Sequence, residues 1–244
     1  EAVNRLIKFK VLAFKIGSGE CNNYPLISYI ASFKKPVIIS TGMNDLNSIK
    51  KAIKILKRNK VKCAILHTTN LYPTPHNLIR LNALNEIKKN FPKTVYGLSD
   101  HTGENYTSFA AVAMGASIVE KHFIDKSSRK GPDISASVNS NQMRDLLHGV
   151  QLIHQAKPGG IKPVKEEKKT AEFAFASVVS NRDIQSGEIL SKKNIWVRRP
   201  GTGDFTAEDY ASLIGKKLSS TLWSFINLLT IDKPKPVPSF FVVK

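Results

Sequence analysis

Short runs of apolar, β-branched residues alternate with amphipathic stretches of helical spacing along the first 157 residues of the chain. The apolar runs predict strands at residues 11–16, 36–40, 62–67, 94–98 and 117–122. The amphipathic stretches predict helices at residues 24–33, 48–58, 80–90, 104–114 and 141–156. Short buried strands joined by helices are typical of a parallel sheet with right-handed crossovers.

The spacing of these units predicts the class of sheet. Five strand–helix units in 157 residues give about 31 residues per unit, the period of a (β/α)8 TIM-type barrel. We therefore expect an α/β fold with an incomplete barrel, in which about five of the eight units are present. Residues 1–10 have the pattern of the end of a helix whose own strand is missing.

The pattern changes at Pro158-Gly159-Gly160, a composition typical of a domain boundary. Beyond it, short apolar runs at 173–179, 183–184, 187–190 and 195–197 predict a small β-rich module without long helices. We expect a partial barrel at residues 1–157, a linker at 158–170 and the small module at 171–217. Residues 218–244 depart from this pattern, and we predict no fold for them.

The charge of the chain changes this picture little. The 244 residues carry a formal net charge of +18, and the cations comprise 29 lysines and only 8 arginines. Lys50, Lys51, Lys54 and Lys57 have the spacing of one helix face, so a solvated surface is the first interpretation. Attraction of a small anionic substrate comes second, and we expect no nucleic-acid partner, because arginine is favoured for such contacts.

Two further features bear on the compartment. No run of about 18 apolar residues predicts a membrane span, and no basic-then-apolar segment opens the chain. The two cysteines, Cys21 and Cys63, are too few for a disulfide scaffold or a zinc ribbon. We therefore predict a cytoplasmic protein without a membrane partner.

Polar side chains follow all five predicted strands, at the point where each strand ends. In parallel α/β folds these carboxyl ends meet at one face, where the chemistry collects. One polar strand end is commonly a turn or a helix cap, but five together favour an active-site face. These strand ends include Lys15, Ser18, Glu20, Ser40, Asn70, Tyr72, Ser99, His101, Glu120 and His122.

The residue types indicate two kinds of binding. Gly17-Ser18-Gly19 and Ser40-Thr41-Gly42, with Lys15, resemble a phosphate cradle, although ordinary turns have the same composition. His101 and His122 lie on successive strand ends, which fits either one shared metal ion or a hydrogen-bonded structural pair. In the first case, Mn²⁺ or Mg²⁺ would also take oxygen ligands from the carboxylates Glu20, Glu120 and Asp133 or from water.

Taken together, the motifs resemble the N-acetylneuraminate (sialic acid) synthase family. They are KIGSGECNNYPL at 15–26, ISTGM at 39–43, HTTNLYPTP at 67–75, GLSDHT at 97–102, VEKHF at 119–123 and GPD at 131–133. Residues 173–179, 183–190 and the VRRPGTG stretch at 197–203 resemble that family's C-terminal antifreeze-like (SAF) domain.

The resemblance implies a metal-assisted condensation of phosphoenolpyruvate with N-acetylmannosamine in a homodimer. It implies that His101 and His122 bind the divalent metal, Mn²⁺ or Mg²⁺, and are catalytic together with Glu20. Tyr72 and Asp133 would contact the amino sugar with Glu20, and Arg199 would reach its N-acetyl group from the partner subunit. The residues implied to hold phosphoenolpyruvate are Lys15, Ser18, Ser40, Asn70 and Ser99.

The departures from the family leave alternatives open. Three strand–helix units of the barrel are missing, and the sequence after Lys217 differs, so we expect a fragment with little or no synthase activity. A synthase for a related legionaminic or pseudaminic acid is the second reading, although Cys21-Asn22-Asn23-Tyr24 favours the N-acetylneuraminate branch. A non-catalytic sugar-binding remnant is the third.

Overall fold

A computed structural model of the chain describes residues 1–126, 128–219 and 221. Its contacts divide the chain into two compact units, Glu1–Pro158 and Gly159–Lys244. Most of the divergent tail predicted at residues 218–244 therefore lies outside the described residues.

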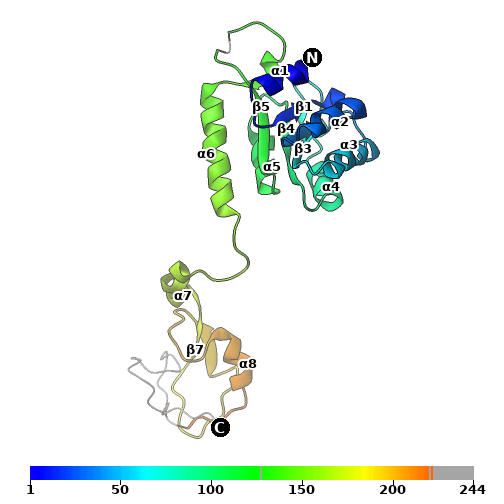
Figure 1. Cartoon of the computed structure of the whole chain (residues 1–244). Coiled ribbons are helices and arrows are strands. Elements are labelled where there is room, and N and C mark those ends of the chain that lie inside the picture. Colours follow the sequence, from blue (N-terminus) through cyan, green and yellow to red (C-terminus); the bar gives the residue numbers. More distant parts are fainter. Residues whose placement is uncertain (127, 220, 222–244) are drawn as a thin grey trace. The chain divides into compact units, whose positions relative to one another are not determined.

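The first unit is built on one parallel sheet of six strands in sequential order, curled into a half-barrel (Figure 1). The incomplete TIM-type barrel is thereby confirmed, and its described strands leave β1 and β6 as the two edges of the sheet. The sixth strand was not predicted, because it has only two residues and follows a 3-10 turn, too short to show any periodicity. The strands are β1 (Phe14–Ile16), β2 (Val37–Ser40), β3 (Cys63–Thr68), β4 (Val95–Asp100), β5 (Ile118–Phe123) and β6 (Ser137–Val138).

Helices alternate with these strands as the sequence predicts, and side-chain caps set the start of several. Asp45 accepts a hydrogen bond from the Ser48 N–H at the start of α3, and Asn139 with Gln142 forms a capping box at α6. None of the helices in the described ranges is long and apolar enough to cross a membrane. The helices are α1 (Ala2–Lys8), α2 (Tyr24–Ser32), α3 (Leu46–Arg58), α4 (Ala83–Asn90), α5 (Tyr106–Ala113) and α6 (Ser140–Ala156).

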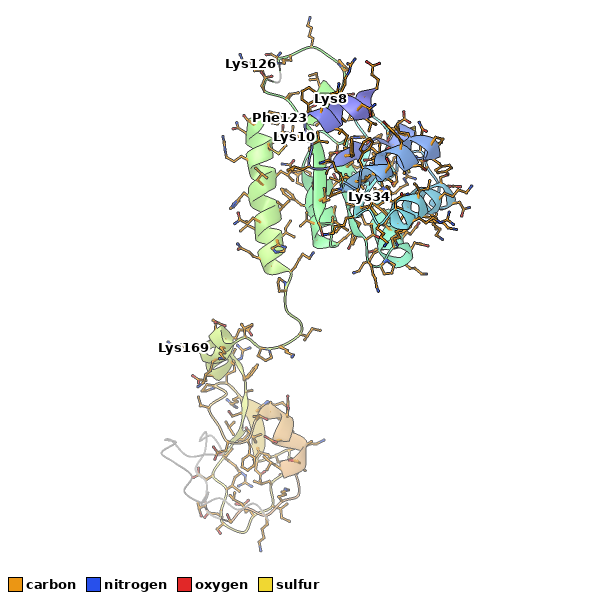
Figure 2. All side chains as sticks on the ribbon, in the orientation of Figure 1. Lys8, Lys10, Lys34, Phe123, Lys126 and Lys169 are labelled. Atoms are coloured by element: carbon orange, nitrogen blue, oxygen red, sulfur yellow. The ribbon has the colours of Figure 1, made fainter. Side chains whose placement is uncertain are left out.

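The main core of this unit lies between the sheet and its helices. Ile39 and Ile65 on the strands are fully buried, as are Ile27 on α2 and Leu56 on α3. The opposite face of α3 carries its lysines, all of which are exposed, as the solvated-surface interpretation predicts. Other lysines, among them Lys8, Lys10, Lys34 and Lys126, also lie at the surface (Figure 2).

One glycine permits the close approach of the two strands that carry the histidines. A Cβ atom on Gly97 of β4 would lie 2.0 Å from the backbone oxygen of Ile118 on β5. Gly97 is also the register partner of Ile118. Any larger residue at this position would therefore push the two strands apart.

The second unit is small and has its own core. Strands β7 (Ser177–Ser180) and β8 (Ile195–Arg198) pair antiparallel, and the helices are α7 (Lys168–Ala174) and α8 (Tyr210–Leu213). The core residues are Val178, Ile184, Leu190, Ile195, Leu213 and Leu218.

The short apolar runs of the second unit form strands only in part. Phe173 and Ala174 belong to helix α7, and the strand begins only at Ser177, where pairing with Arg198 starts. Residues 183–184 and 187–190, for which the sequence left strand and turn open, contain only isolated bridges, at Ile184 and at Ile189, and the second of these is antiparallel to Lys217. The sequence does not show which of these short apolar runs find a partner strand.

Candidate active site

The in-register pairing of β4 and β5 sorts the polar residues at their ends onto two faces of the sheet. Ser99 is the register partner of Glu120, and Asp100 is the partner of Lys121. Because successive side chains in a strand point to opposite faces, Ser99 and Glu120 share one face, and Asp100 and Lys121 share the other. The contacts described next agree with this assignment.

The first face carries a small polar cluster that joins four strands, β1, β2, β4 and β5. Lys15 Nζ lies 2.8 Å from Ser40 Oγ and 3.2 Å from Glu120 Oε1. Ser99 Oγ donates a hydrogen bond of 2.7 Å to the same Glu120 oxygen. The Lys15 and Glu120 side chains are 34% and 41% exposed, so a dissolved anion can reach them. This cluster brings together Lys15, Ser40 and Ser99, three of the five residues expected to hold phosphoenolpyruvate.

The other two residues of that set, Ser18 and Asn70, lie beside the loop that follows β2 and contains Gly42. The Gly42 N–H donates to Ser18 Oγ at 3.0 Å, and a Cβ on Gly42 would lie only 2.0 Å from Asn70 Oδ1. Asn70 Oδ1 is buried and has no hydrogen-bond partner. A buried acceptor without a partner is uncommon in a folded protein, and it is available to an N–H or O–H group of a ligand.

Three aromatic rings gather beside this region. The Tyr72 ring stacks on His101 with centroids 4.2 Å apart, and it meets His122 edge-on at 5.5 Å. The two imidazole rings are themselves 5.2 Å apart and inclined by 72°. The structure therefore brings together the two histidines that the sequence singled out, with Tyr72 against both.

His101 is held by the loop that follows β3. Its Nδ1 lies 2.9 Å from the Thr69 carbonyl oxygen, and its own carbonyl accepts from the Thr74 N–H at 3.0 Å. A carbonyl can only accept, so Nδ1 carries the proton and Nε2 keeps a free lone pair. Burial, together with the neighbouring His122, lowers the pKa of His101. A neutral imidazole with one free nitrogen is the form that binds metal ions.

Two other predicted site residues, Asp133 and Glu20, make no hydrogen bond to the histidines or to the Lys15 cluster in the part of the chain that the structure describes. Asp133 Oδ2 lies 3.9 Å from His122 Nδ1, beyond hydrogen-bond distance. Glu20, on the 3-10 turn Ser18–Glu20, accepts a hydrogen bond of 2.7 Å from Asn23 and is exposed. Arg199 belongs to the second unit, directly after β8, so its position gives no information about the site in the first unit.

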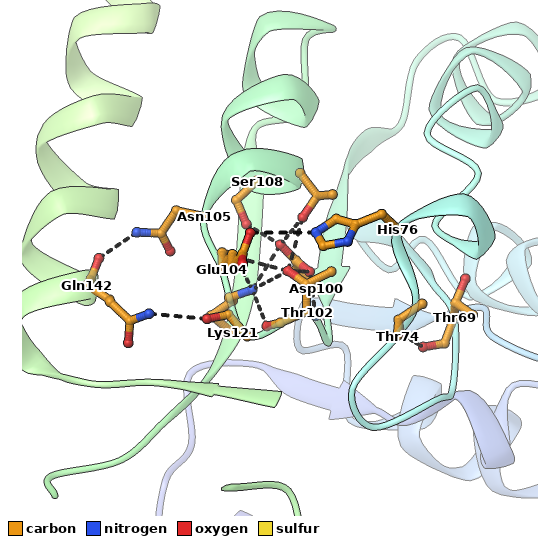
Figure 3. A network of polar contacts seen from close by, with 12 residues as sticks. Thr69, Thr74, His76, Asp100, Thr102, Glu104, Asn105, Ser108, Lys121 and Gln142 are labelled. Carbon is orange, nitrogen blue, oxygen red and sulfur yellow. Dashed lines mark hydrogen bonds and ion pairs between the residues drawn. The ribbon is translucent and has the colours of Figure 1, made fainter. Parts of the chain in front are cut away.

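On the second face of the sheet lies a buried ion pair between Asp100 and Lys121 (Figure 3). Lys121 Nζ is 3.0 Å from Asp100 Oδ2, and the two side chains are 2% and 0% exposed. Burial alone would raise the pKa of Asp100, but the Lys121 ammonium and the hydroxyls of Ser108 and Thr107 hold that pKa below its ordinary value. Burial lowers the pKa of Lys121 despite the attraction of Asp100. Its Nζ nevertheless lies within hydrogen-bond distance of the Asp100 carboxylate and of the Thr102 and Glu104 carbonyls, three acceptors that match the three protons of an ammonium group, so the pair is ionic.

Comparison with known proteins agrees with this geometry. Residues 1–162 match the NeuB family, and residues 175–222 match the SAF domain. The chain belongs to the NeuB family. The first match covers well over half of the chain, so the resemblance inferred from the motifs is confirmed.

Relatives of this NeuB chain include a diacetyllegionaminic acid synthase and an N-acetylneuraminate-9-phosphate synthase. The N,N'-diacetyllegionaminic acid synthase of Campylobacter jejuni is 38% identical over 220 residues, which cover 88% of this chain and 65% of the relative. The human N-acetylneuraminate-9-phosphate synthase is 32% identical over 222 residues, 91% of this chain and 62% of the relative. The chain thus spans less than two thirds of the length of these relatives.

A solved structure also resembles this NeuB chain. The sialic acid synthetase of Leptospira borgpetersenii has a TM-score of 0.65 and 27% identity, covering 70% of this chain and 60% of that one. The half-barrel therefore has the fold of a known synthase.

The donor set fits a divalent metal ion in part. No group of three or more His, Cys, Asp or Glu side chains arranged to hold a metal occurs among the residues the structure describes. Two imidazoles on adjacent strands, one of them fixed by a carbonyl, are nevertheless the kind of pair that catalytic metal sites use. Mn²⁺ or Mg²⁺ held by such a pair would need further oxygen ligands, for example from water.

Sequence reasoning missed the buried Asp100–Lys121 pair and the part played by Glu120 beside Lys15 and Ser99. Both follow from the alternation of side chains in β4 and β5, once the register of the two strands is known. His67, which the sequence left open between core residue and ligand, is buried and bonds through Nε2 to the Ile79 carbonyl at 2.7 Å.

The buried histidines predict a pH dependence of stability. Burial lowers the pKa of His67 and of His101, so the unfolded chain binds more protons than the folded one as the pH falls through about 6.5. We expect the free energy of unfolding to fall between pH 7 and pH 5, by up to about 1.4 kcal/mol per pH unit for each proton.

Urea unfolding followed by far-UV circular dichroism measures this slope. His67→Gln should reduce it, whereas His148→Gln, which changes an exposed histidine of α6, should leave it unchanged. An unaltered slope in His67→Gln would contradict the assignment.

Proposed function

We propose that this chain carries the phosphoenolpyruvate- and metal-binding part of a nonulosonic acid synthase. The observation that supports it best is the juxtaposition, on one face of the half-barrel, of the His101–His122 pair and the cluster of Lys15, Ser40 and Ser99. The synthase relatives and the match to the NeuB family support the same reaction class.

In this proposal the protein's own groups bind and orient two substrates. Lys15, Ser18, Ser40, Asn70 and Ser99 hold the phosphate and carboxylate of phosphoenolpyruvate, since ammonium, hydroxyl and amide N–H donors form strong charge-assisted hydrogen bonds to these anions. A divalent cation held by His101 and His122 would act as a Lewis acid on the aldehyde oxygen of the sugar. Glu20, Tyr72 and Asp133 contact the amino sugar, and Tyr72 also packs against both imidazoles.

The reaction balances without a redox cofactor. The methylene carbon of phosphoenolpyruvate forms a bond to the aldehyde carbon, and the aldehyde oxygen takes up a proton. Water then adds to the former enol carbon, and the C–O bond to phosphate breaks. The products are the nine-carbon sugar acid and inorganic phosphate, formed from phosphoenolpyruvate, the amino sugar and one water.

The amino sugar is the finer part of the proposal. N-acetylmannosamine is our first choice, on the Cys21-Asn22-Asn23-Tyr24 stretch. A diacetylated 6-deoxy sugar is the second, and the higher identity to a diacetyllegionaminic acid synthase favours it. In either case a homodimer is expected, in which Arg199 of the SAF domain reaches the N-acetyl group in the partner subunit. The cytoplasm is the expected compartment, and both cysteines are free.

A metal-binding measurement tests the histidine pair. Binding of Mn²⁺ is measured as the loss of the free-ion signal in electron paramagnetic resonance. His101→Ala and His122→Ala should each abolish this binding. His148→Ala, an exposed histidine of α6, is the matched control and should bind as the parent does. Unchanged Mn²⁺ affinity in His101→Ala would remove that residue from the site.

Calorimetric titration with phosphoenolpyruvate tests the anion cluster. Lys15→Met should weaken binding by at least about tenfold, because a hydrogen bond to a charged group contributes about 1.5–3 kcal/mol. Lys54→Met removes an exposed lysine of α3 and should leave the affinity as it is. Equal affinity in the two variants would mean that phosphoenolpyruvate binds elsewhere.

Phosphate release with each sugar tests the reaction. We expect slow release by the 244-residue chain, because its described strands form an open sheet that leaves the site exposed to water. The faster of N-acetylmannosamine and a diacetylated 6-deoxy sugar identifies the substrate class. Robust turnover would overturn the expectation of low activity, and sugar binding without metal dependence would favour the non-catalytic alternative.

A further inference from the structure

The buried Asp100–Lys121 pair lies immediately behind the two histidines of the candidate site. Asp100 directly precedes His101 at the end of β4, and Lys121 directly precedes His122 on β5. Asp100 and Lys121 are register partners, so the pair joins the two strands at the level of the imidazoles. Whatever fixes this pair also fixes the backbone from which both imidazoles project.

Every acceptor position of Asp100 is used. Its Oδ1 accepts from the Thr102 N–H at 2.9 Å and from Thr102 Oγ1 at 2.8 Å. Its Oδ2 accepts from Thr107 Oγ1 and from Ser108 Oγ, both at 2.6 Å, and faces Lys121 Nζ. The carboxylate therefore joins helix α5 to the end of β4 and to the turn of residues 102–104, which directly follows His101.

Lys121 closes the same turn from the neighbouring strand. Its Nζ donates to the Thr102 carbonyl at 2.7 Å and to the Glu104 carbonyl at 2.6 Å, with Thr102 Oγ1 at 3.0 Å (Figure 3). An ammonium group has three protons, and the Asp100 oxygen takes the direction that these two carbonyls leave. The backbone of residues 102–104 is thus tied to β5, next to His122.

His101 is consequently held from two sides. The loop after β3 binds its Nδ1–H through the Thr69 carbonyl, and the 102–104 turn is fixed by the ion pair. A shift of this turn would move the His101 Cα relative to His122 and change the separation of the two rings. Metal affinity depends on that separation, because bond lengths to a metal vary by only about 0.2 Å.

A buried ion pair of this kind contributes little to net stability. The cost of removing both charges from water offsets much of their attraction, and apolar residues of equal volume fill such a site as well or better. What the pair provides that apolar residues do not is direction, since each of its hydrogen bonds fixes one backbone or side-chain group.

We propose that Asp100 and Lys121 are positioning residues that set the separation and orientation of His101 and His122 for their shared ligand. This inference rests on the proposed function, in which that ligand is a divalent metal ion. It adds to that function a support on the far side of the sheet, made of residues that touch neither metal nor substrate.

The first test removes the ammonium group. Lys121→Met keeps the length of the side chain and should weaken Mn²⁺ binding by about 10- to 100-fold, the range for groups that orient a metal ligand. Lys121→Arg keeps the charge and several donors and should restore most of the affinity. Binding as tight in Lys121→Met as in the parent would overturn the proposal.

A matched threonine pair separates positioning from stability. Thr102 and Thr107 are both buried and both donate to Asp100, but only Thr102 lies in the turn beside His101. We expect the two variants Thr102→Val and Thr107→Val to have comparable midpoints of urea unfolding. Thr102→Val should nevertheless weaken Mn²⁺ binding, whereas Thr107→Val should not. Equal losses in both variants would mean that the network only stabilises the fold, and would overturn the proposal.

A metal-free readout keeps this inference distinct from the proposed function. In ¹⁵N-histidine spectra of the full chain, His101 should be the Nδ1–H tautomer, and Lys121→Met should shift it toward a mixture. If the parent binds no Mn²⁺, the proposed metal site fails, and this tautomer alone decides whether the pair orients His101. If the parent binds Mn²⁺ but neither affinity nor tautomer changes in the variant, the proposed function stands and this inference fails.

Discussion

The alternation of side chains along two in-register parallel strands governs this molecule. On β4 and β5 it places Ser99, Glu120, His101 and His122 toward the candidate site, and Asp100 and Lys121 toward the core. One residue of slip between the strands would exchange the two sets, because the side-chain period is two. Gly97, at which no side chain fits, allows the strands to approach closely enough for this register.

The sequence predicts the fold well where periodicity is long and poorly where it is short. The five longer strands and the helices between them follow from apolar runs and helical spacing, and they agree with the structure to within a few residues. Strand β6 has two residues and no detectable period, and residues 173–174 look like strand although they end helix α7. These short segments take their form from tertiary partners, which local sequence does not show.

The site was predictable to a similar degree. Polar residues at five strand ends indicate one active face, and the structure brings Lys15, Ser40 and Ser99 into one cluster and Tyr72, His101 and His122 into another. The partners of these residues were not predictable, since the contact of Glu120 with Lys15 depends on strand order and curl. Glu20 and Arg199 owe their assigned roles only to the family resemblance.

Glu120 competes with any bound anion for the Lys15 and Ser99 donors. Its carboxylate occupies the position between the Lys15 ammonium and the Ser99 hydroxyl, so these donors already have an acceptor before any ligand arrives. Under the proposed function, phosphate binding exchanges one anion for another, and the net gain is the difference between the two sets of hydrogen bonds. The Glu120 carboxylate holds Lys15 in place but competes with a ligand for its ammonium group. This competition favours doubly charged ligands such as a phosphate over a single carboxylate.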